Sequence, residues 1–353
     1  MRVLVTGGAG FVGGNVCVSL ATLRPDWQVV ALDNLRRRGS ELNVRRLREA
    51  GVEFVHGDVR ELDDVLAVGE VDAVIEASAE PSVLAGLSSG LDYLVRTNLV
   101  GAYHCLELCR RHEAQLVFLS TSRVYPTAAL GGVAYREEET RFELEPVQDA
   151  LGVTETGVTE AFTLNGARTP YGATKLAAEI LVTEYAETFS LTTTVNRCGV
   201  IAGPWQMGKV DQGVVAHWVL AHRLGRPLRY LGYGGSGKQV RDLLHVDDLV
   251  DLLVEQLDDP AHWRGEVLNV GGGRPCSLSL LELTELCREL TGATVEIEPD
   301  PAPRPGDMPI YLSDCTALFA HTAWRPTRQP REIVQDILIW VDNHRHALER
   351  ALD

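Results

Sequence analysis

A tyrosine and a lysine one helical turn apart are the residues of this chain best suited to acid–base chemistry. Tyr171 and Lys175 form the pattern Y-x-x-x-K at the start of a long helical segment, residues 171–189, which places both side chains on one helix face. A nearby ammonium lowers the pKa of a phenol toward neutrality, so Tyr171 can take or give the proton of an alcohol. By itself, the same spacing also occurs on ordinary helix surfaces.

A hydroxyl residue earlier in the chain strengthens this interpretation. Thr121 follows an apolar run at residues 116–119 that is typical of a buried strand. The carboxyl end of a parallel strand delivers side chains to a ligand crevice, where the Thr121 hydroxyl can bridge a substrate oxygen and Tyr171. We therefore predict that Thr121, Tyr171 and Lys175 are catalytic.

The first strand runs directly into a glycine-rich turn. Gly7, Gly10 and Gly13 form G-x-x-G-x-x-G between a strand at residues 2–6 and a helix at residues 13–23. Glycines allow a tight turn, close approach of a pyrophosphate and close helix packing, and the helix N-terminus offers free N–H groups to phosphates. A lone glycine pattern is weak evidence, but the order of strand, turn, helix, strand and acid predicts a dinucleotide site.

The acid of this pattern is Asp33, at the end of the second strand. A carboxylate there can accept hydrogen bonds from both ribose hydroxyls and repels a 2′-phosphate, which favours NAD over NADP. Arg36, Arg37 and Arg38 follow closely and could compensate such a phosphate. We interpret them as a solvated turn and predict NAD.

The elements that must position these residues alternate in type. Short apolar runs alternate with helical patterns, which indicates an α/β Rossmann fold with a doubly wound parallel sheet and a smaller mixed α/β C-terminal lobe. A polar stretch at residues 126–170 is longer than an ordinary connection, so it must fold over another part of the protein or contain short helices or strands of its own. The expected strands are at residues 3–5, 29–32, 54–55, 73–75, 116–119 and 192–195, and the expected helices at 13–23, 41–50, 92–112 and 171–189.

This alternation also suggests domain limits. We expect an NAD-binding domain at residues 1–200, to which the segment 240–272 returns, and a lobe that binds the substrate at residues 201–239 and 273–353. The stretch from Gly232 to Lys238 resembles a phosphate-binding P-loop, but Gln239 stands where such a loop needs Ser or Thr, so we expect an ordinary loop.

Composition excludes several other classes. The formal net charge of -16 argues against nucleic acid or an anionic membrane as a partner. No apolar run is long enough for a membrane span, and the first strand leaves no room for a signal peptide, so we expect a cytoplasmic protein. The 7 cysteines lack metal-ligand spacing, and we expect reduced, buried thiols and no metal.

With these residues in place, the sequence resembles the extended short-chain dehydrogenase/reductase family, which includes NAD-dependent sugar-nucleotide epimerases and dehydratases. The resemblance covers nearly the whole chain, and it implies that Asp58 and Val59 flank the adenine while Lys175 also holds the nicotinamide ribose. The segments that carry it are residues 6–13, 33–34, 57–59, 98, 120–121, 171–175 and 304–307. The cofactor-binding residues it implies are Gly7, Gly10, Phe11, Val12, Gly13, Asp33, Asn34, Asp58, Val59, Ala77, Ala79, Asn98, Tyr171 and Lys175.

Within this family, the chain is most similar to the branch that epimerises CDP-sugars at C2. The similar segments are residues 120–125, 171–175, 196–200, 211–213 and 237–245. The likeness implies transient oxidation to a keto sugar followed by re-reduction on the opposite face, with Arg241 and Arg304 gripping the pyrophosphate. It also implies a homodimer built through a four-helix contact that includes the helix of Tyr171. The implied substrate contacts are Ser122, Arg123, Asn196, Asp211, Gln212, Gln239, Arg241 and Arg304.

Some residues depart from the family pattern. Val200 replaces the Asn that the family commonly uses as a sugar-nucleotide contact, which puts that contact in doubt. Glu76 and Glu80 stand where His and Gln are frequent beside the cofactor, and the sequence assigns them no role.

Three alternatives stay open. Related 4,6-dehydratases carry Asp-Glu directly after the active-site Thr, whereas Ser122 and Arg123 follow Thr121 here, which disfavours dehydration. A 4-epimerase or other oxidoreductase acting on a UDP-, GDP- or dTDP-sugar differs mainly in which carbon faces the cofactor. A non-catalytic NAD-binding sensor is disfavoured by the joint retention of Thr121, Tyr171 and Lys175.

Overall fold

The computed structural model describes residues 1–86, 90–208, 212–302 and 305–352, and the chain divides into two compact units. Unit 1 consists of Met1–Thr121, Pro170–Arg197 and Leu249–Val267. Unit 2 consists of Ser122–Thr169, Cys198–Asp248 and Leu268–Asp353. The division passes through one helix, α9 (Val246–Asp258), and two strands, β10 (Thr193–Cys198) and β14 (Glu266–Val270).

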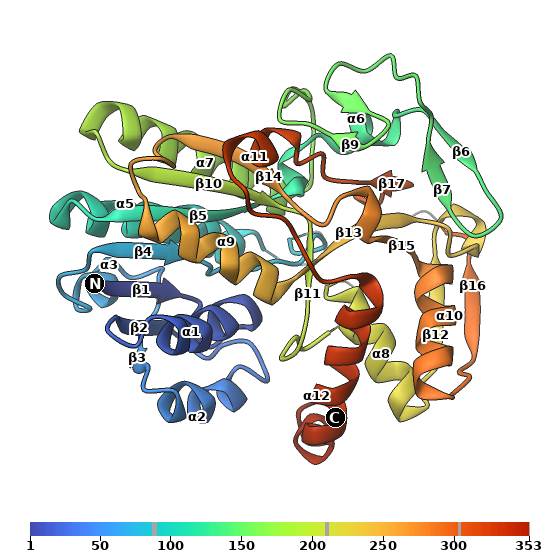
Figure 1. Ribbon diagram of the computed structural model, residues 1–353, viewed down its shortest axis with the longest axis horizontal. Coiled ribbons are helices and arrows are strands. Elements are labelled where there is room, and N and C mark those ends of the chain that lie inside the picture. The colour runs from blue at the N-terminus through green and yellow to red at the C-terminus, as the bar shows by residue number, and fades with distance from the viewer. Residues whose placement is uncertain (87–89, 209–211, 303–304, 353) are drawn as a thin grey trace. The chain divides into compact units, whose positions relative to one another are not determined.

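The centre of unit 1 is a twisted sheet whose strand order is β14-β10-β5-β4-β1-β2-β3 (Figure 1). The pairs β1–β2, β1–β4, β2–β3 and β4–β5 are parallel, and the order reverses between β1 and β4. This is the doubly wound Rossmann arrangement, in which ligands bind beyond the carboxyl ends of the strands at the reversal point. The strands are β1 (Arg2–Thr6), β2 (Gln28–Asp33), β3 (Glu53–His56), β4 (Ala73–Glu76), β5 (Gln115–Thr121) and β10 (Thr193–Cys198).

Helices cover this sheet because the apolar faces of the helices are buried against the continuous apolar strands. One core cluster combines strand residues such as Leu4, Val74 and Phe118 with Leu106 and Val182 from two of the helices, and each of these side chains is at most 1% exposed. Such burial is the main source of stability for a fold of this kind. The helices are α1 (Phe11–Leu23), α2 (Glu41–Glu49), α3 (Leu62–Leu66), α4 (Asp92–Val95), the π-helical turn η1 (Arg96–Val100), α5 (Gly101–His112) and α7 (Pro170–Phe189).

Unit 2 contains several small sheets and most of the C-terminal helices (Figure 1). In its largest sheet, β13 pairs in parallel with β11 and β17 and antiparallel with β15, so β13 is the strand around which the others gather. A second, parallel pair joins β12 to β16. The strands are β11 (Val200–Ala202), β12 (Leu228–Leu231), β13 (Val240–His245), β15 (Ser277–Ser279), β16 (Ile297–Asp300) and β17 (Ile310–Tyr311). The helices are α8 (Val214–Leu224), η3 (Tyr233–Gly235), η4 (Arg274–Cys276), α10 (Leu280–Thr291), α11 (Thr316–His321) and α12 (Pro330–Leu352).

The long polar connection expected at residues 126–170 does carry elements of its own, and these belong to unit 2. It forms two hairpins, β6–β7 and β8–β9. The elements of this connection and of the turn before it are η2 (Ser122–Val124), α6 (Thr127–Gly131), β6 (Tyr135–Glu137), β7 (Phe142–Leu144), β8 (Val153–Thr154) and β9 (Gly157–Val158).

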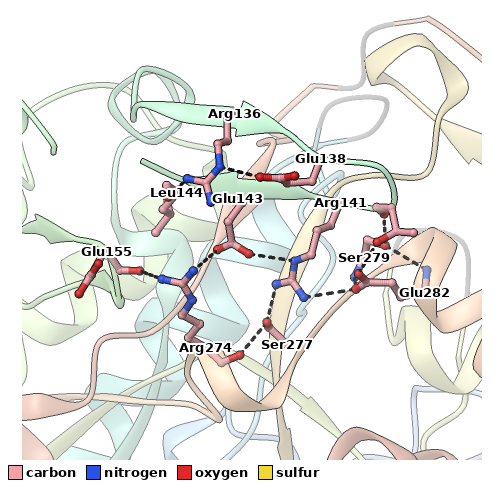
Figure 2. A network of polar contacts seen from close by, with 11 residues as sticks. Arg136, Glu138, Arg141, Glu143, Leu144, Glu155, Arg274, Ser277, Ser279 and Glu282 are labelled. Carbon is pink, nitrogen blue, oxygen red and sulfur yellow. Dashed lines mark hydrogen bonds and ion pairs between the residues drawn. The ribbon is translucent and has the colours of Figure 1, made fainter. Parts of the chain in front are cut away.

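Charged side chains tie the β6–β7 hairpin to the region around β15 and α10 (Figure 2). The Glu143 carboxylate lies between two guanidinium groups, with Oε2 3.3 Å from Arg141 Nε and Oε1 3.1 Å from Arg274 Nη2. Arg141 also donates to Ser277 Oγ at 2.7 Å and pairs with the Glu282 carboxylate at 3.3 Å. This network attaches the hairpin together with the apolar side chains of Phe142 and Leu144, which are buried.

The observed units differ from the expected domain limits in one main respect. The expected NAD-binding domain includes residues 122–169, whereas these residues belong to unit 2. Of the segment 240–272, the part from Leu249 to Val267 lies in unit 1, and β13 instead forms the middle of the unit 2 sheet. None of the described helices combines the length and apolar composition that crossing a membrane requires.

Candidate active site

The glycine turn after β1 is built for close approach. Gly7 has φ of +62°, and a Cβ on Gly13 would lie 2.2 Å from the carbonyl oxygen of Gly7, so a side chain at Gly13 would collide with the turn. Helix α1 begins directly after Gly10, which leaves the N–H groups of Phe11 and Val12 in its first turn. The turn therefore has the shape and the donors that a pyrophosphate requires.

The Asp33 carboxylate is fixed beside this turn. Its Oδ2 accepts a hydrogen bond from the Ala9 backbone N–H at 3.0 Å, and its Oδ1 accepts one from Leu35 N–H at 2.7 Å. Burial raises the pKa of Asp33, although both backbone hydrogen bonds oppose that rise. The carboxylate is thus held where a ribose of a dinucleotide bound at the turn would meet it, so these residues fit the cofactor that the sequence predicts.

Asn34 and Asp58, two of the expected cofactor-binding residues, are joined by a hydrogen bond. Asn34 Nδ2 donates to Asp58 Oδ2 at 2.9 Å, and Arg60 Nη2 donates to the same oxygen at 2.6 Å. The guanidinium groups of Arg36 and Arg60 lie over the Tyr93 ring, 4.1 and 4.9 Å from its centroid. Arg36 is therefore stacked on an aromatic ring, an arrangement that the sequence could not indicate.

Two of the three expected catalytic side chains share α7, and the third ends β5. Tyr171, Lys175 and Thr121 are 9%, 2% and 8% exposed, and α7 packs against β5. The Lys175 ammonium lies 3.9 Å from the centroid of the Phe118 ring, three residues before Thr121. It also lies 3.2 Å from Oε2 of Glu76, so Lys175 is held by a buried carboxylate.

Asn98 connects the expected cofactor-lining segment to the helix of Tyr171. Its Oδ1 accepts from the Glu80 backbone N–H at 2.8 Å, and its Nδ2 donates at 3.2 Å to Thr174 Oγ1. The side chain is fully buried and comes from the π-helical turn η1, a feature frequent at functional sites. At the other end of the segment, the Ala77 N–H donates to Thr6 Oγ1 at 3.2 Å. Residues 77–80 are therefore anchored at both ends.

In unit 2, three expected substrate residues converge on one loop, residues 306–308. Arg123 Nη1 donates to the Gly306 carbonyl at 2.7 Å. Arg241 Nη2 lies 2.9 Å from Asp307 Oδ1 and also donates to the Met308 carbonyl at 2.8 Å. Gln239 Nε2 lies 3.5 Å from Asp307 Oδ2. The segment that follows Arg304 in the sequence is thus held by the predicted substrate residues themselves.

Asn196 lies in β10 and is fully buried in unit 1. Its amide exchanges two hydrogen bonds of 2.9 Å with the Gln256 amide of α9. Its contact with the substrate stays a prediction.

For two of the other expected substrate residues, the structure gives a position and a degree of burial. Ser122 and Gln212 are half-buried in unit 2, in η2 and just before α8. Asp211 and Arg304 lie outside the described residues.

Three acidic residues matter more than the sequence indicated. Glu76 pairs with Lys175, Asp307 pairs with Arg241, and Glu179 accepts from Ser120 and Arg197. Glu179 follows Lys175 by four residues, so its place on the same face of α7 was available from spacing alone.

Comparison with known proteins places this site in context. A model of the NAD dependent epimerase/dehydratase family matches residues 3–271. CDP-paratose 2-epimerase of Salmonella typhi is 29% identical over 97% of this chain and 100% of that protein. dTDP-glucose 4,6-dehydratase of Mycobacterium tuberculosis is 29% identical over 92% of this chain and 88% of that protein. The solved UDP-glucose 4-epimerase of Thermus thermophilus, in complex with NAD, has a TM-score of 0.75 and 28% identity, covering 97% of this chain and 99% of that chain.

Proposed function

Because the chain belongs to the NAD-dependent epimerase/dehydratase family, we propose that it interconverts two CDP-linked sugars of the paratose and tyvelose type that differ in configuration at C2. The cofactor is NAD. The observation that carries the proposal is that the glycine turn, Asp33 and the set of Thr121, Tyr171 and Lys175 all belong to one compact unit. The full-length similarity to CDP-paratose 2-epimerase supports the choice of carbon and nucleotide.

In the proposed reaction, Tyr171 moves the proton of the sugar hydroxyl. The glycine turn and Asp33 would hold NAD+, which would supply the chemistry of reversible hydride transfer at the sugar carbon. We infer that Lys175 holds the nicotinamide ribose, and that Thr121 orients the sugar oxygen toward the Tyr171 phenol. Tyr171 takes the hydroxyl proton during oxidation and gives it back during reduction, so no net proton is consumed.

The residues after Thr121 favour epimerisation over elimination of water. Elimination needs an acid and a base near the sugar, and Ser122 and Arg123 supply no carboxylate at this place in the chain. The Arg123 guanidinium is instead bound to the Gly306 carbonyl. This position differs from the acidic pair expected of a dehydratase.

We further propose that the nucleotide is held in unit 2 through its diphosphate. Arg241 presents a planar guanidinium, which suits bidentate contact with phosphate oxygens, and Arg304 is its proposed partner. A firm hold on the nucleotide leaves the sugar free to turn over between oxidation and reduction, as epimerisation requires.

The direct test is to incubate the protein with CDP-paratose and to follow the appearance of the C2 epimer by NMR, beside UDP-, GDP- and dTDP-hexoses. We expect conversion of the CDP-sugar and a kcat lower by roughly 10²–10⁴-fold in Tyr171→Phe. Tyr185→Phe is the matched control, because that phenol lies on the same helix and donates to Glu107. Turnover of a UDP-hexose alone would replace the proposal with a 4-epimerase, which the likeness to the Thermus thermophilus protein makes the second candidate.

We also propose that the protein is a homodimer that uses α5 and α7. These helices contact each other, and they carry the exposed apolar side chains of Tyr103 and Ile180, which are 39% and 58% exposed. Exposed apolar surface on neighbouring helices favours association. Light scattering should give twice the mass of one chain, and a monomeric mass would refute the dimer.

A further inference from the structure

Glu76 is a buried carboxylate at the end of the sheet where the cofactor crevice opens. It is the last residue of β4, and the sheet register places it between Thr6 of β1 and Phe118 of β5. Thr6 leads into the glycine turn, and Phe118 lies shortly before Thr121. The carboxyl ends of these strands form the ligand crevice of a doubly wound fold, so Glu76 carries its charge at that crevice.

Each carboxylate oxygen of Glu76 contacts a neighbouring side chain. Glu76 is 0% exposed, its Oε2 lies 3.2 Å from Lys175 Nζ, and its Oε1 accepts a hydrogen bond of 2.6 Å from Ser78 Oγ. Lys175 in turn is 2% exposed and lies over the Phe118 ring. Burying one such group alone would be strongly unfavourable, so each of the two side chains offsets the cost of burying the other.

This pairing changes the net charge that the site presents. A lysine alone would make the crevice cationic, whereas Lys175 with Glu76 is neutral overall. The nicotinamide ring is cationic in NAD+ and neutral in NADH, so a nearby carboxylate stabilises the oxidised form relative to the reduced form. The ribose, pyrophosphate and adenine are identical in the two forms, and their contacts cancel in the comparison.

We propose that Glu76 is a positioning residue that holds Lys175 and, through its charge, sets the preference of the site for NAD+ over NADH. The inference rests on the proposed placement of Lys175 at the nicotinamide ribose. A site with this preference keeps the cofactor oxidised between turnovers and favours return of the hydride to the sugar, which an epimerase needs in every cycle.

The test is to equilibrate the protein with equal amounts of NAD+ and NADH and to measure the ratio bound by mass spectrometry. Glu76→Gln keeps the size of the side chain and removes its charge. We expect its bound ratio to shift toward NADH by on the order of tenfold. Asp72→Asn is the matched control, since it removes a charge at the opposite end of β4, where Asp72 accepts from the Arg2 N–H. The control should leave the ratio unchanged.

A second variant separates the loss of the Glu76 charge from a disturbed fold. Glu76→His, measured at alkaline pH where the imidazole is neutral, introduces the residue that the family pattern often has here and should shift the ratio in the same direction. A purely structural role for Glu76 would weaken both cofactor forms alike, and an unchanged ratio in a folded variant overturns the proposal, as does an equal shift in Asp72→Asn.

This measurement involves no sugar. A ratio shift in a protein that turns over no CDP-sugar would therefore support the role of Glu76 and remove only the proposed substrate.

Discussion

Arg197 and Glu179 form a buried ion pair between β10 and the helix of Tyr171. Arg197 Nη2 lies 2.8 Å from Glu179 Oε2, and the two side chains are 7% and 6% exposed. The Ser120 hydroxyl of β5 donates to the same carboxylate. Glu179 lies one helical turn beyond Lys175, so the pair fixes α7 against two strands of the sheet and with it the orientation of Tyr171 and Lys175.

Breaking this pair should therefore destabilise unit 1. We expect Glu179→Ala to lower the free energy of unfolding by roughly 3–5 kcal/mol, because it leaves the Arg197 charge buried without its partner. Urea denaturation measures this, with Glu49→Ala as the control in the exposed pair Arg45–Glu49, where little or no loss of stability is expected. Equal losses in the two variants would show that the buried pair has no special role.

Arg241 should act on the sugar nucleotide and leave NAD binding alone. We expect Arg241→Ala to raise the KM for the CDP-sugar by roughly 10- to 100-fold, since charge-assisted hydrogen bonds to the diphosphate are lost. Arg229→Ala is the control, because Arg229 forms an exposed pair with Glu298. Steady-state kinetics and NAD titration distinguish the outcomes, and an unaltered KM would remove Arg241 from the substrate site.

Asp33 should decide between the two dinucleotides. Its carboxylate is tied to Ala9 and Leu35, so it cannot turn away from a 2′-phosphate. We expect Asp33→Asn to weaken NAD binding and to narrow the preference for NAD over NADP by roughly tenfold or more. Competitive binding of the two dinucleotides checks this. A preference that stays at the wild-type value would mean that other groups select the cofactor.

Asp58 should make stability depend on acid pH. Burial alone would raise the pKa of Asp58, but hydrogen bonds from Arg60 and Asn34 outweigh it and lower the pKa from 3.8 to about 2. A folded-state pKa below the unfolded value gives stability that is present above 3.8 and is lost as the pH falls through about 2. In Asp58→Asn this dependence should disappear, so urea denaturation from neutral to acid pH should show the two proteins converging. A constant difference between them would contradict the assignment.

Much of the fold follows from local pattern. The continuous apolar strands and α7 are recognised from the period of their apolar residues, and α7 at Pro170–Phe189 differs by one residue from the expected 171–189. The glycine turn, Asp33 and the Y-x-x-x-K pair were predictable for the same reason, because each depends on residues close together in the sequence.

Contacts between distant residues were not predictable in this way. Glu76 and Lys175 lie 99 positions apart, so the sequence showed an unexplained acid and a lysine without showing that they meet. Asn196 belongs to a conspicuous motif, yet its amide is used by Gln256 of α9. The polar segment 122–169 lacked apolar periodicity, and its contacts within unit 2 include ion pairs between distant residues, such as Glu143 with Arg274, that no local pattern contains.

The central claim is that Tyr171 and bound NAD epimerise the sugar by oxidising and re-reducing one carbon. The most direct measurement uses CDP-paratose labelled with deuterium at C2, converted by the wild-type protein in ordinary water and analysed by NMR. We predict that the deuterium is retained at C2 of the epimer, because the hydrogen leaves for the cofactor and returns from it. Replacement of the label by solvent hydrogen would contradict the account, since it would mean that the carbon loses a proton instead.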